Sequence, residues 1–207
     1  MSKASIWNYL KTHTQLTDEA IAGIMGNFEA ESNCEACRVQ GDFTSDRHVS
    51  KEYARQVNSG ALPNWHTDSK GWGLAQWTYY TRKNNLKKCC ESYGVGIEDE
   101  SAQLAFFLSE MQMKFLSTWN NLLRCHSIYD AASLVCCDYE RPAVNNIQIR
   151  AQYGQQIYNE FHGKDVTPEP IPAPTPVPDQ DMTDKLSKIY NLLIQIEALL
   201  KEIILNN

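Results

Sequence analysis

Two glutamates near the end of a predicted helix are the first residues that could do chemistry. Apolar residues at the helical period mark the buried face of segment 17–31, and Glu29 and Glu31 lie on opposite shoulders of that face. Glu31 ends the helix, where the negative end of the helix dipole disfavours another negative charge, and burial would act in the same direction. Both effects favour the protonated carboxyl that general acid catalysis requires. Position favours Glu31 only slightly, and a glutamate at a helix end is far more often structural or solvated.

A second segment, residues 68–80, combines glycines, aromatic rings and an amide. Gly71 and Gly73 permit close backbone approach, and Gln76 offers an amide to hydroxyl groups. The flat rings on which sugars could pack are those of Trp72, Trp77, Tyr79 and Tyr80. The pattern indicates a sugar-binding surface, and packing of the same rings in the core is an equally weighted alternative.

The seven cysteines do not indicate a disulfide framework, because their number is odd and four of them form two vicinal pairs. We expect mostly reduced, buried thiols. Cys34 and Cys37 form a C-x-x-C that could be half of a zinc site or a redox pair. Neither a second such motif nor a spaced histidine pair completes it, so we predict no metal and no cofactor.

The charge pattern excludes one class of partner. The net charge is −6, without a basic stripe, which makes a nucleic acid an improbable ligand. Residues 1–19 lack the apolar run of a signal peptide, and no run of about 18 apolar residues could cross a membrane. We therefore expect a soluble chain with no signal peptide and no membrane partner.

The elements that must position these residues are mainly helices. The predicted helices cover 5–11, 17–31, 50–57, 78–93, 100–115, 127–140 and 147–161. The long polar stretch between Cys34 and Gly73 could hold a short β-hairpin and is of the length that usually serves function. We expect a mainly α catalytic domain over residues 1–163.

Two further segments follow this domain. Residues 164–181 are rich in proline, which favours an extended, semi-rigid linker. In residues 182–207, apolar residues recur at alternating steps of four and three, the period of a coiled coil. The residues expected to drive oligomerisation are Leu186, Ile189, Leu193, Ile196, Leu200 and Ile203. Leu at position a and Ile at position d favour a homotetramer or a trimer, with the tetramer preferred, and a helix folding back on its own domain is the alternative.

Four sequence blocks carry a resemblance to a known family. The blocks are AGIMGN at 22–27 leading into EAES at 29–32; HTDS at 66–69 running into GWGLAQWT at 71–78, with Arg82; QLAFFL at 103–108; and YERP at 139–142, followed by Arg150, Tyr153, Ile157 and Tyr158. In order and spacing, residues 5–161 resemble the phage tail-type lysozyme family, found in phage endolysins and tail-associated wall hydrolases. The resemblance implies a lysozyme-like helical fold and bacterial peptidoglycan as the substrate.

The resemblance also implies roles for individual residues. The family's catalytic acid is the glutamate of a Glu-Ser pair ending a helix, which corresponds to Glu31 and Ser32 and decides against Glu29. The segment from Gly73 to Gln76 resembles the part that lines the cleft. The residues expected to bind substrate or support the cleft are Ser32, Trp72, Gly73, Gln76, Trp77, Tyr80 and Tyr139, with Glu140 and Arg141 beside Tyr139 as a support or a structural ion pair.

Two points depart from the family pattern or stay open. Asn33 stands where the family usually has a glycine, so the loop after the acid could differ in shape. Asp68 is the best candidate for a second catalytic carboxylate, as a base that orients water or as a charge that stabilises the sugar cation. Otherwise Asp68 caps a loop, and water held by neutral groups or the muramyl 6-hydroxyl completes the reaction.

We expect an endolysin-type, muramidase-like glycosidase that cleaves β-1,4 bonds of peptidoglycan and stays in the host bacterial cytoplasm until it is released onto the cell wall. A lytic transglycosylase of the same fold is one alternative. A phage tail or adhesion protein that only binds glycan is another. A C-x-x-C metal or redox protein ranks last.

Overall fold

The structure, a computed structural model, describes residues 3–164. The predicted linker and the predicted coiled coil, including Leu186, Ile189, Leu193, Ile196, Leu200 and Ile203, lie outside the described residues. The helices, in chain order, are α1 (Lys3–His13), α2 (Asp18–Ser32), α3 (His48–Asn58), the 3-10 turn η1 (Trp65–Thr67), α4 (Tyr80–Ser92), α5 (Glu100–Met113), α6 (Leu116–Leu122), α7 (Ile128–Leu134), the π-helical turn η2 (Val135–Glu140) and α8 (Ile147–Phe161).

The prediction of a mainly α fold is confirmed, with two differences in detail. Between Cys34 and Gly73 the described backbone forms α3, η1 and turns, and its only β pairing is single antiparallel bridges, such as that between Val39 and Trp72. The hairpin considered there does not form. The predicted helix 127–140 changes at Val135 from an α-helix to a π-helix.

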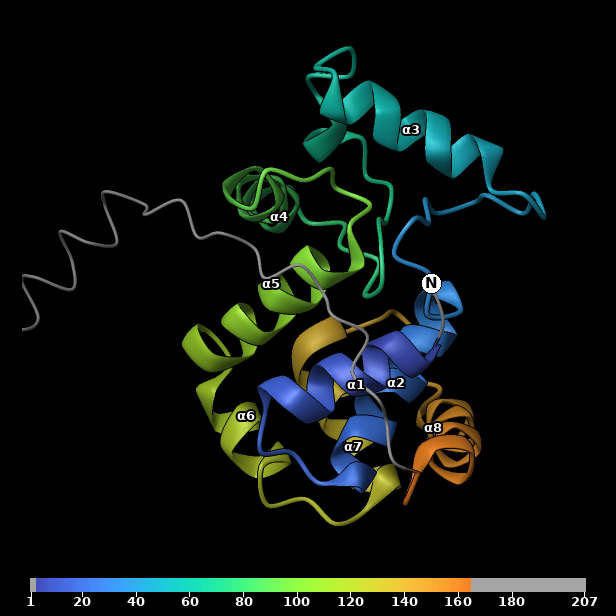
Figure 1. The fold of residues 1–207 in the computed structure, drawn as a ribbon, viewed down its shortest axis with the longest axis vertical. Coiled ribbons are helices and arrows are strands. Elements are labelled where there is room, and N and C mark those ends of the chain that lie inside the picture. Colours follow the sequence, from blue (N-terminus) through green and yellow to red (C-terminus); the bar gives the residue numbers. More distant parts are fainter. Residues whose placement is uncertain (1–2, 165–207) are drawn as a thin grey trace, which may run out of the picture. The chain divides into compact units, whose positions relative to one another are not determined.

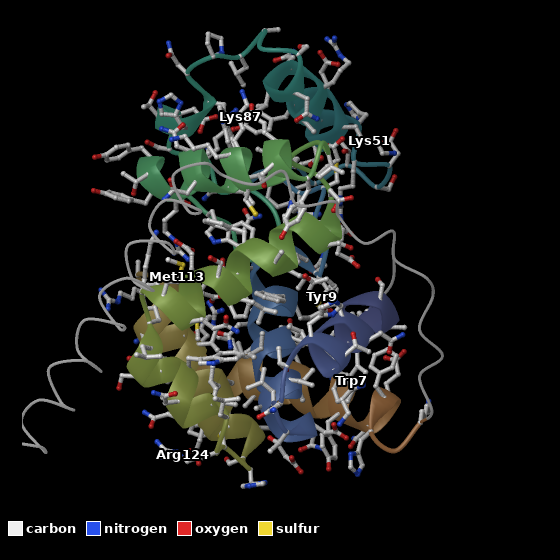
Figure 2. The ribbon with its side chains drawn as sticks, turned by 60° about the vertical axis from the view of Figure 1, so that its left-hand side comes forward. Trp7, Tyr9, Lys51, Lys87, Met113 and Arg124 are labelled. Atoms are coloured by element: carbon white, nitrogen blue, oxygen red, sulfur yellow. The ribbon has the colours of Figure 1, made fainter. Side chains whose placement is uncertain are left out.

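Helix α2 lies at the centre of a group of helices that also contains α1, α7 and α8. Figure 1 shows α1, α7 and α8 gathered around it, whereas α3 and α4 lie on the far side of α5. Almost every residue of α2 from Ala20 to Phe28 is buried, so the helix contacts protein on nearly all sides. On one flank, Trp7 of α1, labelled in Figure 2, lies near α8. Its ring packs against that of Phe161, with ring centroids 5.7 Å apart.

Helices α2 and α8 approach closely because glycines face each other across the contact. A Cβ atom on Gly26 would lie 2.2 Å from the carbonyl oxygen of Arg150, and one on Gly154 would lie 2.8 Å from that of Ala22. Only a residue without a side chain fits at such a separation. This contact brings the first turns of α8 alongside the last turns of α2.

The ends of α2 are fixed by local hydrogen bonds. The Thr17 side chain caps the start by accepting a hydrogen bond from the Ala20 amide at 3.1 Å. At the other end, Asn33 has φ of 59° in the left-handed region, and its amide donates to the carbonyl of Glu29 at 3.0 Å. Asparagine tolerates this conformation better than most residues. Asn33 can therefore adopt the left-handed conformation that a glycine would adopt after the Glu-Ser pair.

Candidate active site

Glu31 lines a pocket of about 400 Å³ beside the end of α2. The other lining residues are Gln40, Ala75, Gln76, Thr78, Glu140, Arg141 and Pro142. Three of these, Gln40, Gln76 and Thr78, are neutral hydrogen-bonding side chains. The pocket thus places a carboxyl beside groups that can hold sugar hydroxyls.

Arg150 of α8 binds Glu31 from the protein side. Its Nη2 lies 2.6 Å from Oε1 of Glu31, and its Nη1 lies 2.5 Å from Oε2 of Glu140 and 3.1 Å from Oδ1 of Asn27. The Arg150 and Glu140 side chains are only 6% and 3% exposed, whereas that of Glu31 is 21% exposed. Glu31 therefore presents the solvent-accessible carboxyl of a largely buried cluster.

This cluster corrects two expectations drawn from the sequence. Glu31 lies against a guanidinium, not only against apolar side chains as the helical pattern suggested. The suggested ion pair between Glu140 and Arg141 is wrong, because Glu140 pairs with Arg150 and the Nε of Arg141 donates to the carbonyl of Asp138 at 2.9 Å. Arg150 belonged to a matching sequence block but had no assigned role.

Glu29, the rival candidate, lies elsewhere. Its carboxylate pairs with Nζ of Lys3 at 2.8 Å, and it is not among the residues that line the Glu31 pocket. The structure therefore separates two glutamates that the helical period alone could barely distinguish.

Ser32 has a structural role next to the acid. Its hydroxyl is buried and donates to the carbonyls of Phe28 and Leu74, each at 3.0 Å. A direct contact with substrate, as expected from the sequence, would need this hydroxyl to be accessible. Instead it joins the end of α2 to the turn that faces the pocket.

That turn, residues 72–77, is held by main-chain and amide hydrogen bonds. Trp72 and Trp77 exchange backbone hydrogen bonds at 3.0 and 3.2 Å, and the left-handed Gly73 accepts from the amide of Gln76 at 3.1 Å. The Gln76 side chain donates to the carbonyls of Gly73 and Arg38 and still borders the pocket. Gln76 thus borders the pocket beside Glu31, and Gly73 shapes the backbone of the turn that carries Gln76.

The predicted sugar-binding surface is only partly present. Trp72, Trp77 and Tyr139 are all buried, and their polar atoms bind inside the protein. The Trp77 indole donates to the Tyr139 hydroxyl at 2.9 Å, which in turn donates to Glu110 at 3.0 Å. For Trp72 and Trp77 the expectation of sugar stacking is wrong, and the alternative of core packing is correct. Tyr139, expected beside the cleft, is also part of the core.

Tyr79 and Tyr80 are exposed and remain available to a ligand. Their ring centroids lie 4.8 Å apart, and they line a pocket of about 460 Å³ with residues 66, 67, 69 and 78. Thr78 lines both this pocket and the one beside Glu31. The two pockets are therefore adjacent.

Asp68 does not lie with Glu31. Its carboxylate accepts from Nζ of the buried Lys83 at 2.6 Å and from the Tyr53 hydroxyl at 2.6 Å, and it lines neither pocket. Burial alone would raise the pKa of Asp68, but the hydrogen bonds from Lys83 and Tyr53 outweigh it and hold the pKa below its usual value. The geometry fits a residue that stabilises its loop.

The C-x-x-C motif shows no sign of an ion-binding cluster. Cys34 is buried, and burial raises the pKa of its thiol far above the usual value. Within residues 3–164, no three His, Cys, Asp or Glu side chains are grouped closely enough to hold a metal ion. In the same range, no helix is long and apolar enough to cross a membrane.

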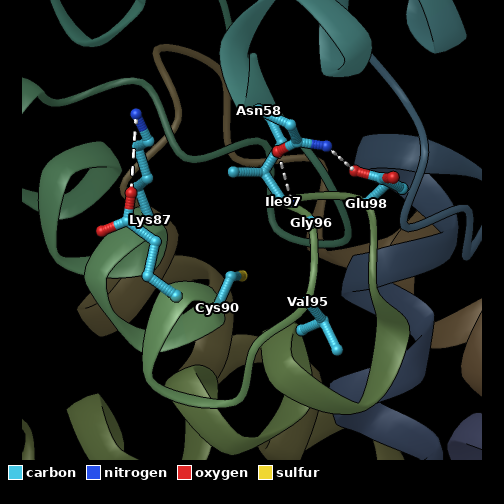
Figure 3. Close-up of a pocket in the computed structure, with 8 residues that line it drawn as sticks. Asn58, Lys87, Cys90, Val95, Gly96, Ile97 and Glu98 are labelled. Atoms are coloured by element: carbon cyan, nitrogen blue, oxygen red, sulfur yellow. Dashed lines mark hydrogen bonds and ion pairs between the residues drawn. The ribbon is translucent and has the colours of Figure 1, made fainter. Parts of the chain in front are cut away.

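Another pocket, of about 240 Å³, lies between α3, α4 and the loop before α5 (Figure 3). Its polar side chains already bind one another: Asn58 donates to Glu98 at 2.8 Å, and Lys87 pairs with Glu91 at 3.6 Å. It contains no carboxyl backed by a buried cation. The pocket beside Glu31 is the better candidate for catalysis.

Comparison with known proteins identifies the first domain. A family model described as phage tail lysozyme matches residues 2–161, which is more than half of the chain. The match includes Glu31, Glu140 and Arg150. A comparison with curated proteins found no match.

Proposed function

The chain belongs to the phage tail lysozyme family, and on that premise we propose that it cleaves the β-1,4 glycosidic bonds of peptidoglycan with Glu31 as the general acid. Membership gives a lysozyme-like role on peptidoglycan in general terms. One observation carries the more specific proposal: Glu31 is the most exposed member of a largely buried carboxyl–guanidinium cluster and borders a pocket whose lining includes three neutral hydrogen-bonding side chains.

In the proposed reaction, the Glu31 carboxyl donates its proton to the glycosidic oxygen as the bond to the anomeric carbon breaks. The bonding electrons move to the leaving oxygen, and the sugar passes through a cation-like transition state. A hydroxyl then adds to the anomeric carbon and releases its proton. In this proposal Gln40, Gln76 and Thr78, which line the pocket, bind sugar hydroxyls, and Tyr80 packs against a sugar further along the strand.

The source of the attacking hydroxyl separates two enzymes of the same fold. Water would give a muramidase-like hydrolase, and the muramyl 6-hydroxyl would give a lytic transglycosylase. Asp68 supplies no support for a base across the sugar, because its carboxylate binds Lys83 and Tyr53. Mass spectrometry of the products decides between reducing ends and anhydro-sugars.

The test of the proposed acid compares two glutamates of α2. Purified protein should clear a suspension of Gram-positive cell walls, and Glu31→Gln should lower the rate by about 10²–10⁴-fold, the usual contribution of general acid catalysis. The matched control is Glu29→Gln, which changes a glutamate that pairs with Lys3 and should retain the parental rate. Full activity in a folded Glu31→Gln variant would eliminate the mechanism. Glycan binding without cleavage by the unmodified chain would favour the alternative of a binding protein.

We further propose that residues 182–207 assemble the chain into a homotetramer, which would gather several catalytic domains on one polymeric substrate. Light scattering should give four chains per particle for the full chain and one after truncation at Gly163. Three chains would identify a trimer, and equal numbers for both proteins would contradict the coiled coil. Action on the cell wall after release from the host cytoplasm completes the proposal.

A further inference from the structure

Glu31 and Glu140 share a single cation. One guanidinium nitrogen of Arg150 lies 2.6 Å from Glu31, and the other lies 2.5 Å from Glu140. Both carboxyls also line the same pocket, although Glu140 is almost completely buried and Glu31 is not. Two ionised carboxylates on one guanidinium would leave a net charge of −1 in a largely buried place. A buried cluster of this kind is stabilised when its charges balance.

The two carboxyls are neighbours on one guanidinium. Burial raises the pKa of Glu140 well above its usual value, and the neighbouring Glu31 raises it further, against the opposing effect of Arg150. Two like charges on one cation disfavour the second ionisation, so the cluster favours a proton on one of the two carboxyls. Oε1 of Glu140 is buried and receives no hydrogen bond from the described donors. The cluster can therefore hold one proton, which the two carboxyls share.

Among residues 3–164, Arg150 is the one cation that pairs with Glu140, so no second cation takes the place of this proton. The charged or titratable groups that face Glu140 are Glu31 from α2, Arg150 from α8 and Cys136 from its own π-helical turn, where burial raises the pKa of the thiol. Arg141 borders the same pocket, and its Nε is engaged by the Asp138 carbonyl. The π-helical turn ends at Glu140, and turns of this kind recur at functional sites.

We propose that Glu140 is a positioning residue that shares one proton with Glu31 across Arg150, so that Glu31 can be protonated while Glu140 balances the guanidinium. The inference rests on the proposed function, because Glu31 is the group that donates to substrate. With one proton the cluster is neutral in either arrangement. The same proton can lie on Glu140 at rest and on Glu31 when the glycosidic oxygen is in place.

The proton balance over one cycle closes. The O–H bond of Glu140 breaks as the O–H bond of Glu31 forms, and Arg150 then faces an ionised Glu140. Glu31 gives the proton to the leaving oxygen, which also takes the electron pair of the broken C–O bond. The attacking hydroxyl, from water in a hydrolase, loses one proton to the cluster as it bonds to the anomeric carbon. No oxidant, reductant or further reactant is needed.

Glu140→Gln tests the proposal by removing only the titratable group. Glutamine resembles the neutral carboxyl in shape, but it leaves Glu31 as the only carboxylate of Arg150, which favours the ionised form of Glu31. The alkaline side of the pH–activity profile should move by about one pH unit or more toward lower pH. At neutral pH, kcat should fall about tenfold for each unit of this shift. KM should stay unchanged. Adding Arg150→Gln to this variant removes the cation and should move the profile back.

Glu110→Gln is the matched control. Glu110 is as buried as Glu140 and pairs with Arg82 at 2.8 Å, but it lies outside the pocket of Glu31. Its loss should lower the thermal stability without moving the pH–activity profile. A folded Glu140→Gln variant with the parental profile, or with an equal loss of kcat at every pH, would overturn the proposal and make Glu140 a structural residue.

A direct measurement covers the case in which Glu140→Gln does not fold. In the unmodified full chain with ¹³C-labelled glutamate side chains, one carboxyl of the cluster should stay protonated at neutral pH, and Glu31→Gln should shift that signal to the ionised position. Glu100 is a second buried carboxyl with a pKa raised by burial, and Glu100→Gln identifies its signal. No protonated carboxyl apart from Glu100, or one that Glu31→Gln leaves in place, would overturn the proposal.

The two proposals fail in different ways. If the unmodified chain leaves cell walls intact and the labelled carboxyls still titrate together, the proposed function fails and the shared proton stands. If walls are cleared, Glu31→Gln is inactive and Glu140→Gln keeps the parental profile, only the role of Glu140 fails.

Discussion

The side chain of Ser32 donates a hydrogen bond to the main-chain carbonyl of Leu74, 42 residues further along the chain, at 3.0 Å. Ser32 directly follows the proposed acid, and Leu74 lies in the turn that supplies Gln76 to the pocket. One hydroxyl therefore joins the end of the helix that carries the proposed proton donor to the turn that carries a proposed substrate-binding side chain. Buried hydrogen bonds of this kind are costly to leave unmade.

Ser32→Ala should reduce both stability and activity. It leaves the Leu74 carbonyl without this partner inside the protein, which costs about 1–3 kcal/mol in free energy of unfolding. The turn is then free to move relative to Glu31, so kcat should fall as well. Chemical denaturation and wall-clearing rates measure the two effects. Ser92→Ala is the control, since the Ser92 hydroxyl donates to the Cys89 carbonyl of its own helix. An equal loss of activity in both variants would contradict the role given to Ser32.

Gly73→Ala should be much more damaging than Gly60→Ala. Both glycines have left-handed backbones, with φ of 73° and 77°, so both substitutions carry a conformational cost of about 1–2 kcal/mol. A Cβ on Gly73 would also lie 2.4 Å from Oε1 of Gln103, whereas one on Gly60 would meet nothing within 4 Å. Differential scanning calorimetry should show a larger loss of Tm for Gly73→Ala, together with lost activity. Similar Tm values for the two variants would show that the turn can rearrange around Gln103.

Tyr80→Ala should weaken substrate binding and leave the fold intact. The ring is exposed beside the pocket that adjoins Glu31, so its loss should raise KM for glycan strands while Tm changes little. Trp77→Phe is the contrasting variant. It removes the buried hydrogen bond to Tyr139 and should lower Tm. A Tyr80→Ala enzyme with unchanged KM for long strands would exclude the tyrosines from the binding surface.

Asp42→Asn should lower stability at neutral pH, by an amount that shrinks in acid. Burial would raise the pKa of Asp42, but hydrogen bonds from Ser50 and Thr44 outweigh burial and hold it far below its usual value. Because the pKa is lowered on folding, this stabilisation is complete above the unfolded value of about 3.9 and is lost as the pH falls toward the folded value. The difference in unfolding free energy should be about 1.5–3 kcal/mol at pH 7 and smaller at pH 3. A difference independent of pH would mean that the charge of Asp42 is not what the hydrogen bonds stabilise.

Most of the helices were predictable because their signals are local. Apolar periodicity located most of the helices, and the Thr17 cap agrees with the expected start of α2. Helix α6 was missed because it has only seven residues and carries too short a pattern. The choice of Glu31 over Glu29 needed the resemblance, and the positions of the two carboxyls in the structure agree with that choice.

Contacts between distant parts of the chain were not predictable from one sequence. Arg150 is 119 residues from Glu31, and nothing near either residue signals the pair. The burial of Trp72 and Trp77 depends on which elements cover them, so their types fitted a surface and a core equally well. The π-helical turn that ends at Glu140 breaks the helical period, and a regular pattern cannot anticipate where such a break occurs.

The pairing of Glu31 with Arg150 has a consequence for the protein during its synthesis. The ribosome releases α2 early, but the guanidinium that completes the cluster lies in α8, the last helix of the domain. A chain still being translated has the proposed acid without its partner, and α2 has an uncovered face until α8 emerges. The cluster of Glu31 and Arg150 should therefore form in one late step, when α8 docks on α2.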